Sequence, residues 1–282
     1  ITEMREQIRL WFYSMLFMSV TLENTPPYNS VLVYEKLLDE KGNPMHKSAG
    51  NAIWFDDAAE KMGVDIMRFQ YASQNPKTNL LFGYTPGKEV KRKLDVIWNT
   101  SSYINIYCNK KNTKESKPND VDLWLISRRE TTKKNASKYL EQLQPNLAIK
   151  EIATFLIDDL SRSYGQFVRD SLNEKTTQAV LRNSYIEGLT LLAPFLPFMT
   201  ESLYQKIKQK KKSIFLEPWP KHNQRVINLN LETQMQQAKE IKKQLKDNNK
   251  NIKSKKLLGV AISVKDSICV KDVESAAGSR IL

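Results

Sequence analysis

The 282-residue chain has few cysteines, histidines and glycines, and each shortage excludes a class of protein. Cys108 and Cys269 are too few for a disulfide framework or a four-cysteine zinc site, so we expect no zinc. With His46 and His222 as the only histidines, a histidine-rich metal centre is not expected either. Nine glycines and eleven prolines exclude collagen-like and low-complexity chains. No run of 18 apolar residues occurs, so we expect no membrane span.

Positive charge is concentrated in the rear of the chain. Lysine and arginine number 44 against 31 acidic residues, a net charge of +13. Residues 1–85 carry a net −2, residues 86–220 a net +8 and residues 221–282 a net +7. A near-neutral front and a basic rear indicate that the rear faces a polyanion such as a nucleic acid. A solubilising, lysine-rich surface is the alternative interpretation.

The front of the chain mixes helical and strand patterns. Residues 6–22 (EQIRLWFYSMLFMSVTL) predict a helix that is buried on most sides. Residues 30–34 (SVLVY) predict a strand, which residues 37–39 would extend. Residues 55–62 and 65–72 predict two further helices.

From residue 88 onward, apolar residues recur at helical spacing. Five segments carry this pattern: 88–107, 121–143, 146–170, 176–192 and 197–209. Their connections are short, which favours an antiparallel helix bundle. A polar helix is then predicted over 231–249, followed by alternating segments at 257–264 and 267–273 that predict a small hairpin.

Residues 42–51 (GNPMHKSAGN) form the most specific motif. A glycine-flanked loop with one lysine and one serine can bring an ammonium group to a polyphosphate, although composition alone predicts only a polar turn. The motif resembles the KMSKS signature loop of class I aminoacyl-tRNA synthetases, with Pro44 and His46 replacing its first lysine and first serine. The resemblance implies catalytic roles for Lys47 and Ser48. It also implies ATP binding by Met45, His46, Lys47, Ser48 and Asn51.

Residues 3–12 (EMREQIRLWF) resemble the E-x-x-D-Q-x-R-G-W-F segment of isoleucyl- and valyl-tRNA synthetases. The resemblance implies that Glu3 contacts the aminoacyl-adenylate and that Gln7 and Trp11 line the amino-acid pocket. Their spacing places all three on one helical face if Glu3 lies at or just before the helix start. Taken alone, Trp11 is more typical of a core position.

Further segments resemble the same family in the correct order through the chain. They are residues 62–69, 94–108, 121–128, 159–164, 192–201 and 214–220. On the predicted helix 146–170, Arg162, Gln166 and Arg169 share the face opposite the apolar stripe. Such a face can hold phosphates or an unstacked base, or can simply be solvated. We predict tRNA binding by Arg128, Arg162 and Arg169.

These observations predict a mostly α chain in three parts. Residues 1–85 would be the end of a class I Rossmann-type catalytic domain, residues 86–220 an antiparallel, anticodon-binding helix bundle, and residues 221–282 a junction helix with the start of a small α+β extension. The resemblance implies a cytoplasmic isoleucyl-tRNA synthetase that uses isoleucine, ATP, Mg²⁺ and tRNA(Ile), with no membrane partner. A valyl enzyme and a non-catalytic tRNA-binding module are the alternatives.

The chain begins at Ile1 and contains no HIGH motif, the other ATP-binding signature of class I synthetases. We therefore expect a piece of a longer enzyme, inactive when isolated.

Overall fold

The computed structural model describes residues 1–108, 117–207 and 211–247. These residues form two compact units, and the longer helices contribute to both. Unit 1 comprises Ile1–Asn99, Asn135–Ala153 and Leu189–Pro218, and unit 2 comprises Thr100–Lys134, Thr154–Gly188 and the chain from Trp219 onward. The predicted hairpin at 257–273 lies outside the described residues.

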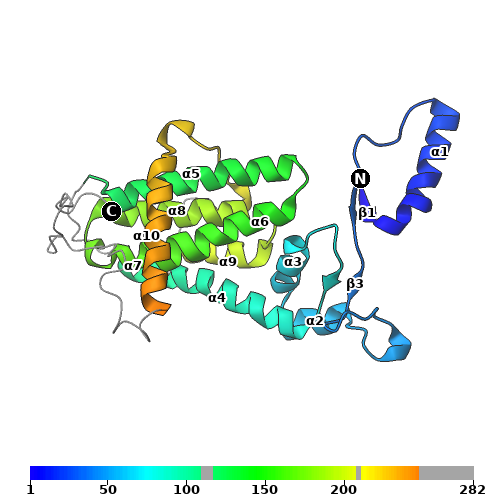
Figure 1. Ribbon diagram of the computed structural model, residues 1–282, viewed down its shortest axis with the longest axis horizontal. Coiled ribbons are helices and arrows are strands. Elements are labelled where there is room, and N and C mark those ends of the chain that lie inside the picture. Colours follow the sequence, from blue (N-terminus) through cyan, green and yellow to red (C-terminus); the bar gives the residue numbers. More distant parts are fainter. Residues whose placement is uncertain (109–116, 208–210, 248–282) are drawn as a thin grey trace. The chain divides into compact units, whose positions relative to one another are not determined.

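Helices dominate both units (Figure 1). The α-helices are α1 (Trp11–Glu23), α2 (Phe55–Met62), α3 (Val64–Ser73), α4 (Tyr84–Tyr107), α5 (Asp120–Glu141), α6 (Pro145–Thr154), α7 (Gly165–Phe167), α8 (Lys175–Leu192), α9 (Pro197–Lys206) and α10 (Leu229–Asp247). A π-helix, η3, spans Phe155–Tyr164, and the 3-10 helices are η1 (Arg5–Arg9), η2 (Lys47–Ala49), η4 (Arg169–Ser171), η5 (Ile214–Leu216) and η6 (Gln224–Val226). Helices occupy the predicted helical segments other than 6–22 and 146–170, with ends shifted by a few residues.

Two pairs of parallel strands form the front of unit 1. Strand β1 (Thr2–Met4) pairs with β2 (Leu32–Tyr34), and α1 connects the two. Strand β3 (Leu37–Leu38) pairs with β4 (Leu80–Leu81), and α2 and α3 lie between them in the chain. Parallel strands require such crossover connections because a tight hairpin cannot join them. The predicted α/β character of the front is therefore confirmed, and the expected extension at 37–39 is a separate strand.

The prediction of a single buried helix over 6–22 is wrong. The segment forms η1 and α1, which are separated at Leu10 by a non-helical φ of −117° and ψ of −100°. Among the described side chains of α1, Phe12 alone is buried, while Trp11 is 47% exposed and Phe17 60% exposed. Because the segment is apolar on all sides, one neighbouring element can cover only part of it. Tyr28 supplies that cover, with its ring centroid 6.1 Å from that of Phe12.

A small core holds the rest of unit 1's front together. Ala58, Met67 and Phe82 are buried against one another. Helix α3 is also tied to the segment between α8 and α9, because the Arg68 guanidinium donates to the Phe195 carbonyl at 2.7 Å. These contacts fix α2 and α3, which follow the signature loop in the chain.

The helices of unit 2 form an antiparallel bundle, as the short connections predicted. The Tyr164 hydroxyl of η3 donates to the Asp122 carboxylate of α5, and Arg128, later in α5, pairs with Asp159, earlier in η3. Helices α5 and η3 therefore run in opposite directions. Arg129 of α5 donates to Ser184 of α8, and Lys133, one turn later in α5, donates to Glu187, one turn later in α8. These two helices therefore run in parallel. This alternation of direction is the up-down arrangement of a helix bundle.

The predicted helix 146–170 is α6 followed by η3, where the hydrogen bonds change to π-helical spacing. Gly188 of α8 allows close packing there, because a Cβ added to it would lie 2.5 Å from Leu156 Cδ2. Helix α10 crosses α5 (Figure 1), and the Glu232 carboxylate accepts hydrogen bonds from Ser127 and Thr131.

Candidate functional site

Asp39 and Asn51 define the shape of the signature loop. The Asn51 amide nitrogen donates to Asp39 Oδ2 at 2.9 Å and to the Pro44 carbonyl at 3.0 Å. Its amide oxygen accepts from the His46 backbone N–H at 2.9 Å. The Asp39 carboxylate also accepts from the backbone N–H of Asn43 at 2.8 Å. These hydrogen bonds lower the pKa of Asp39, the Asn51 amide being the main cause.

Of the five predicted ATP-binding residues, two hold the loop in shape. Asn51 has both ends of its amide engaged within the loop. Met45 packs against the core of Ala58, Met67 and Phe82. Both side chains therefore anchor the loop, and their contact with ATP stays a prediction.

The other three residues, His46, Lys47 and Ser48, are exposed on the loop. The Lys47 ammonium nitrogen lies 4.5 Å from the centroid of the Trp54 ring, a cation–π contact. Gly50 follows with a φ of +68°, which turns the chain after η2. Trp54 was not identified as a site residue from the sequence. The available signal was its position, an aromatic residue seven positions after Lys47 and close to the motif.

Glu40, just before the turn of the signature loop, attaches this loop to α4. The Glu40 carboxylate accepts from the Thr85 backbone N–H at 2.6 Å, in the first turn of α4. Gly83 lies against the Glu40 side chain, since a Cβ built on Gly83 would be 2.1 Å from Glu40 Cγ. The loop is thus attached to a long helix as well as to its own core.

Glu3, Gln7 and Trp11 lie in three consecutive elements, so they do not share one helix. Glu3 lies in β1, and its carboxylate accepts from the Tyr34 hydroxyl at 3.1 Å. Gln7 lies in η1, and its side-chain oxygen accepts from the Trp11 backbone N–H at 3.3 Å. Trp11 opens α1 and is about half exposed. Their contact with an adenylate stays a prediction.

Arg128, a predicted tRNA ligand, has an ion-pair partner inside unit 2. Its Nε lies 2.9 Å from Asp159 Oδ2, and its side chain is 16% exposed. The Lys239 ammonium of α10 lies 2.6 Å from the other oxygen of Asp159 and 4.5 Å from the Trp124 ring centroid. Arg128 therefore helps fasten α10 to α5 and η3, a role that sequence spacing alone did not indicate.

Arg162 and Arg169 lie on the surface, as the helical face predicted. Arg162 forms an exposed ion pair with Asp158, with a distance of 2.8 Å. Arg169 begins η4 and is exposed. Exposed pairs of this kind contribute little to stability. Phosphate binding by Arg162 and Arg169 stays a prediction.

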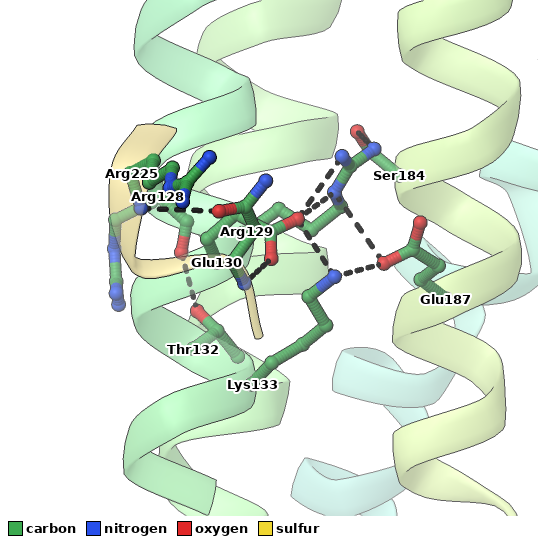
Figure 2. Close-up of polar contacts among 9 residues, drawn as sticks. Arg128, Arg129, Glu130, Thr132, Lys133, Ser184, Glu187 and Arg225 are labelled. Carbon is green, nitrogen blue, oxygen red and sulfur yellow. Dashed lines mark hydrogen bonds and ion pairs between the residues drawn. The ribbon is translucent and has the colours of Figure 1, made fainter. Parts of the chain in front are cut away.

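A partly buried cluster of charges joins α5 to α8, and Figure 2 shows its polar contacts. Glu130 lies 3.1 Å from Arg129 Nη2 and 2.7 Å from Lys133 Nζ. Lys133 also lies 2.7 Å from Glu187 on α8. The Glu130 carboxylate additionally accepts from the Asn223 backbone N–H at 2.7 Å. Two acids thus balance two bases, and Arg129 is held in a defined position.

Cys108 shows no sign of reactivity. Burial raises the pKa of its thiol to about 11, so the thiolate is scarce at neutral pH. Among the described residues, no three His, Cys, Asp or Glu side chains cluster as metal ligands. No helix in the described part of the chain is long and apolar enough to cross a membrane.

Comparison with protein families gives one match in the rear of the chain and one in its front. Residues 122–265 match the family described as the anticodon-binding domain of tRNA ligase. Residues 1–81 match the family described as class I tRNA synthetases (I, L, M and V).

Curated relatives include isoleucine–tRNA ligases from three archaea. Those of Methanothrix thermoacetophila and Archaeoglobus fulgidus are each 31% identical to this chain, covering 86% of it and 25% of the relative. That of Saccharolobus solfataricus is 30% identical, covering 86% of this chain and 26% of the relative. The chain therefore spans about a quarter of the length of these relatives.

A solved structure supports the fold. The ternary LeuRS-tRNA-LeuAMS complex of Agrobacterium radiobacter K84 is similar with a TM-score of 0.68 and 18% identity, covering 80% of this chain and 29% of that one. Since the anticodon-binding family matches about half of the chain and the synthetase family matches its front, the chain belongs to the class I aminoacyl-tRNA synthetases, as a relative of the isoleucine–tRNA ligases.

Proposed function

We propose that this chain is part of a cytoplasmic isoleucine–tRNA ligase. In this proposal the front contributes a lysine to the activation of isoleucine by ATP, and the helical rear binds tRNA(Ile). The observation that carries the proposal is the signature loop, in which Asp39 and Asn51 fix the backbone while the Lys47 ammonium is left exposed. Family membership and the isoleucine–tRNA ligase relatives support the choice of reaction.

Lys47 would act on the pyrophosphate that leaves ATP. The isoleucine carboxylate attacks the α-phosphorus, and the bond from that phosphorus to the β-phosphate bridging oxygen breaks. Negative charge then accumulates on the departing pyrophosphate, where an ammonium group stabilises it. The contact of Lys47 with Trp54 is worth only about 0.5–1 kcal/mol at an exposed position, so a polyphosphate can displace it.

Mg²⁺ would accompany the nucleotide. The described residues form no group of three or more metal-ligating side chains. When bound, Mg²⁺ supplies positive charge to phosphate oxygens. The loop residues Lys47, Ser48 and His46 would contribute to that chemistry from this chain.

The amino-acid pocket would involve Glu3 and Trp11. The Glu3 carboxylate is positioned by the Tyr34 hydroxyl and would contact the α-ammonium or the ribose hydroxyls of the adenylate. The exposed face of Trp11 offers an apolar wall to a branched side chain. Such a wall discriminates isoleucine from valine by about 1–3 kcal/mol, so we expect activation of both with isoleucine preferred by roughly a hundredfold.

The test of the proposal is Lys47→Ala in the complete ligase polypeptide that contains this chain. ATP–pyrophosphate exchange should fall at least about tenfold, or roughly 1.4 kcal/mol of transition-state stabilisation. Lys41→Ala is a matched control, because Lys41 is an exposed lysine of the same loop region. It should leave the exchange rate within about twofold.

Unchanged exchange in Lys47→Ala would remove Lys47 from the mechanism. The replacements Pro44 and His46 favour a second candidate, a tRNA-binding module without catalysis. Under that candidate, the unsubstituted polypeptide would bind tRNA(Ile) and show no exchange at all. Exchange and filter-binding assays on the same preparation therefore separate the two functions.

A further inference from the structure

The ring of Trp54 lies against the side chain that the proposed reaction needs. The Lys47 ammonium nitrogen is 4.5 Å from the ring centroid, within the distance of about 6 Å at which a π face attracts a cation. Trp54 follows the motif at 42–51 by three residues, so the resemblance to the KMSKS loop assigns it no role. Both side chains are exposed. A ligand can therefore compete with the ring for the lysine.

The backbone on both sides of this contact is fixed by hydrogen bonds. The Lys47 carbonyl accepts from the Gly50 backbone N–H at 3.2 Å, which closes η2. The Trp54 carbonyl accepts from the Ala58 backbone N–H at 3.0 Å, which ties Trp54 to the first turn of α2. Lys47 can therefore leave the ring by rotation of its own four-carbon side chain, while the backbone stays in place.

The ring and a phosphate compete for the same ammonium group. The face of an aromatic ring is the negative side of its quadrupole, so it attracts a cation and disfavours phosphate oxygens beside it. Lys47 must accordingly exchange the ring for the phosphate as charge develops on the departing pyrophosphate. The loss of an exposed cation–π contact corresponds to about a two- to fivefold factor in a rate or an affinity.

We propose that Trp54 is a positioning residue that holds Lys47 in a resting position, an inference that rests on the proposed function of Lys47. Trp54 acts through the lysine and touches no reacting atom. Because the contact is present in the free enzyme and lost in the transition state, it lowers kcat/KM for ATP. The ring thereby sets how readily Lys47 engages the phosphates.

The test is ATP–pyrophosphate exchange by the complete ligase polypeptide that contains this chain. Trp54→Leu removes the π face and keeps an apolar side chain, so kcat/KM for ATP should rise about two- to fivefold. Trp54→Phe keeps a weaker π face, so its rise should be smaller. Phe55→Leu is the matched control, because Phe55 is the adjacent aromatic residue and is 63% exposed, against 55% for Trp54. It should change kcat/KM by less than about 1.5-fold.

A double-mutant cycle asks whether Trp54 acts through Lys47. In the Lys47→Ala background, Trp54→Leu should leave kcat/KM unchanged, because no ammonium is present for the ring to hold. Fluorine NMR of the polypeptide labelled with fluorotryptophan follows the ring itself. The Trp54 resonance should shift when inorganic pyrophosphate is added, and the shift should be smaller in Lys47→Ala. A role in folding alone would produce neither the cycle nor this difference.

Two results would overturn the resting position of Lys47. One is a kcat/KM for Trp54→Leu and Trp54→Phe equal to or below that of the unsubstituted polypeptide. The other is an equal rise from Trp54→Leu with and without Lys47. Either result leaves the proposed role of Lys47 intact. Unchanged exchange in Lys47→Ala would instead overturn the proposed function and the role of Trp54 together.

Discussion

Asp39 in unit 1 and Asp159 in unit 2 both organise polar contacts between separate parts of the chain, but in different surroundings. Each carboxylate gathers hydrogen-bond donors from residues that are not adjacent in sequence. Asp39 accepts from neutral N–H groups of its own loop and is partly exposed. Asp159 faces the cations of Arg128 and Lys239, and its side chain is 8% exposed.

The difference shows how burial changes the contribution to stability of the polar contacts around a carboxylate. Water competes for the donors around Asp39, so their bonds define a shape at little energetic gain. Around Asp159 little water is available, so each group depends on the others, and losing one leaves an unpaired charge. A loop that must receive a ligand suits the first arrangement, and a helix that must stay attached suits the second.

The largest effect should follow from neutralising Asp159. Asp159→Asn removes the buried carboxylate that Arg128 and Lys239 share, and we expect the free energy of unfolding in urea to fall by roughly 3 kcal/mol. Asp158→Asn is the matched control, because the neighbouring Asp158 forms an exposed pair with Arg162, and it should cost less than about 1 kcal/mol. Similar losses for the two variants would mean that burial does not separate the two positions.

A second comparison is between two glycines of unit 2. A Cβ at Gly188 would lie 2.5 Å from Leu156 Cδ2, so Gly188→Ala should overpack the bundle and cost about 1–3 kcal/mol. A Cβ at Gly165 would meet its nearest atom, the Leu160 carbonyl oxygen, at an ordinary 3.6 Å. Gly165 has helical backbone angles, so Gly165→Ala should stabilise by about 0.5–1 kcal/mol. Urea unfolding of both variants measures the contrast, and a destabilised Gly165→Ala would contradict it.

The helices of the bundle were predictable because their information is local. Each shows apolar residues at helical spacing, and the short connections between them limited the topology. The π-helical section at Phe155–Tyr164 was not predictable in the same way, because a change of hydrogen-bond spacing does not alter the apolar stripe. The exposure of α1 was missed because an apolar sequence indicates a need for cover but not how much cover the neighbouring elements provide.

Side-chain partners were less predictable than side-chain chemistry. The motif at 42–51 identified a loop with an exposed lysine, but not that Asn51 bonds to Asp39, twelve residues earlier. Arg128 was predicted to bind tRNA, which stays a prediction, but its pairing with Asp159 on another helix was not predicted. Neither contact follows a helix or strand period, so sequence spacing contains no signal for it.

The smallest effect concerns the protonation of Asp39. The Asn51 amide is the main cause of its lowered pKa, so Asn51→Ala should raise that pKa toward the ordinary aspartate value. Asn43→Ala is the control, because its side-chain bond to Asp39 is longer, at 3.4 Å, and its backbone N–H remains. It should raise the pKa less.

The sign of the accompanying stability change follows from linkage. A carboxyl whose pKa is lower in the folded chain stabilises it above the unfolded pKa, and this contribution is lost as the pH falls through the folded pKa. The stability difference between the unsubstituted chain and Asn51→Ala should therefore be present at neutral pH and shrink in acid. NMR titration of the Asp39 carboxyl carbon measures the pKa directly. If the pKa of Asp39 is the same in Asn51→Ala and in the unsubstituted chain, then Asn51 does not hold the loop through this carboxylate.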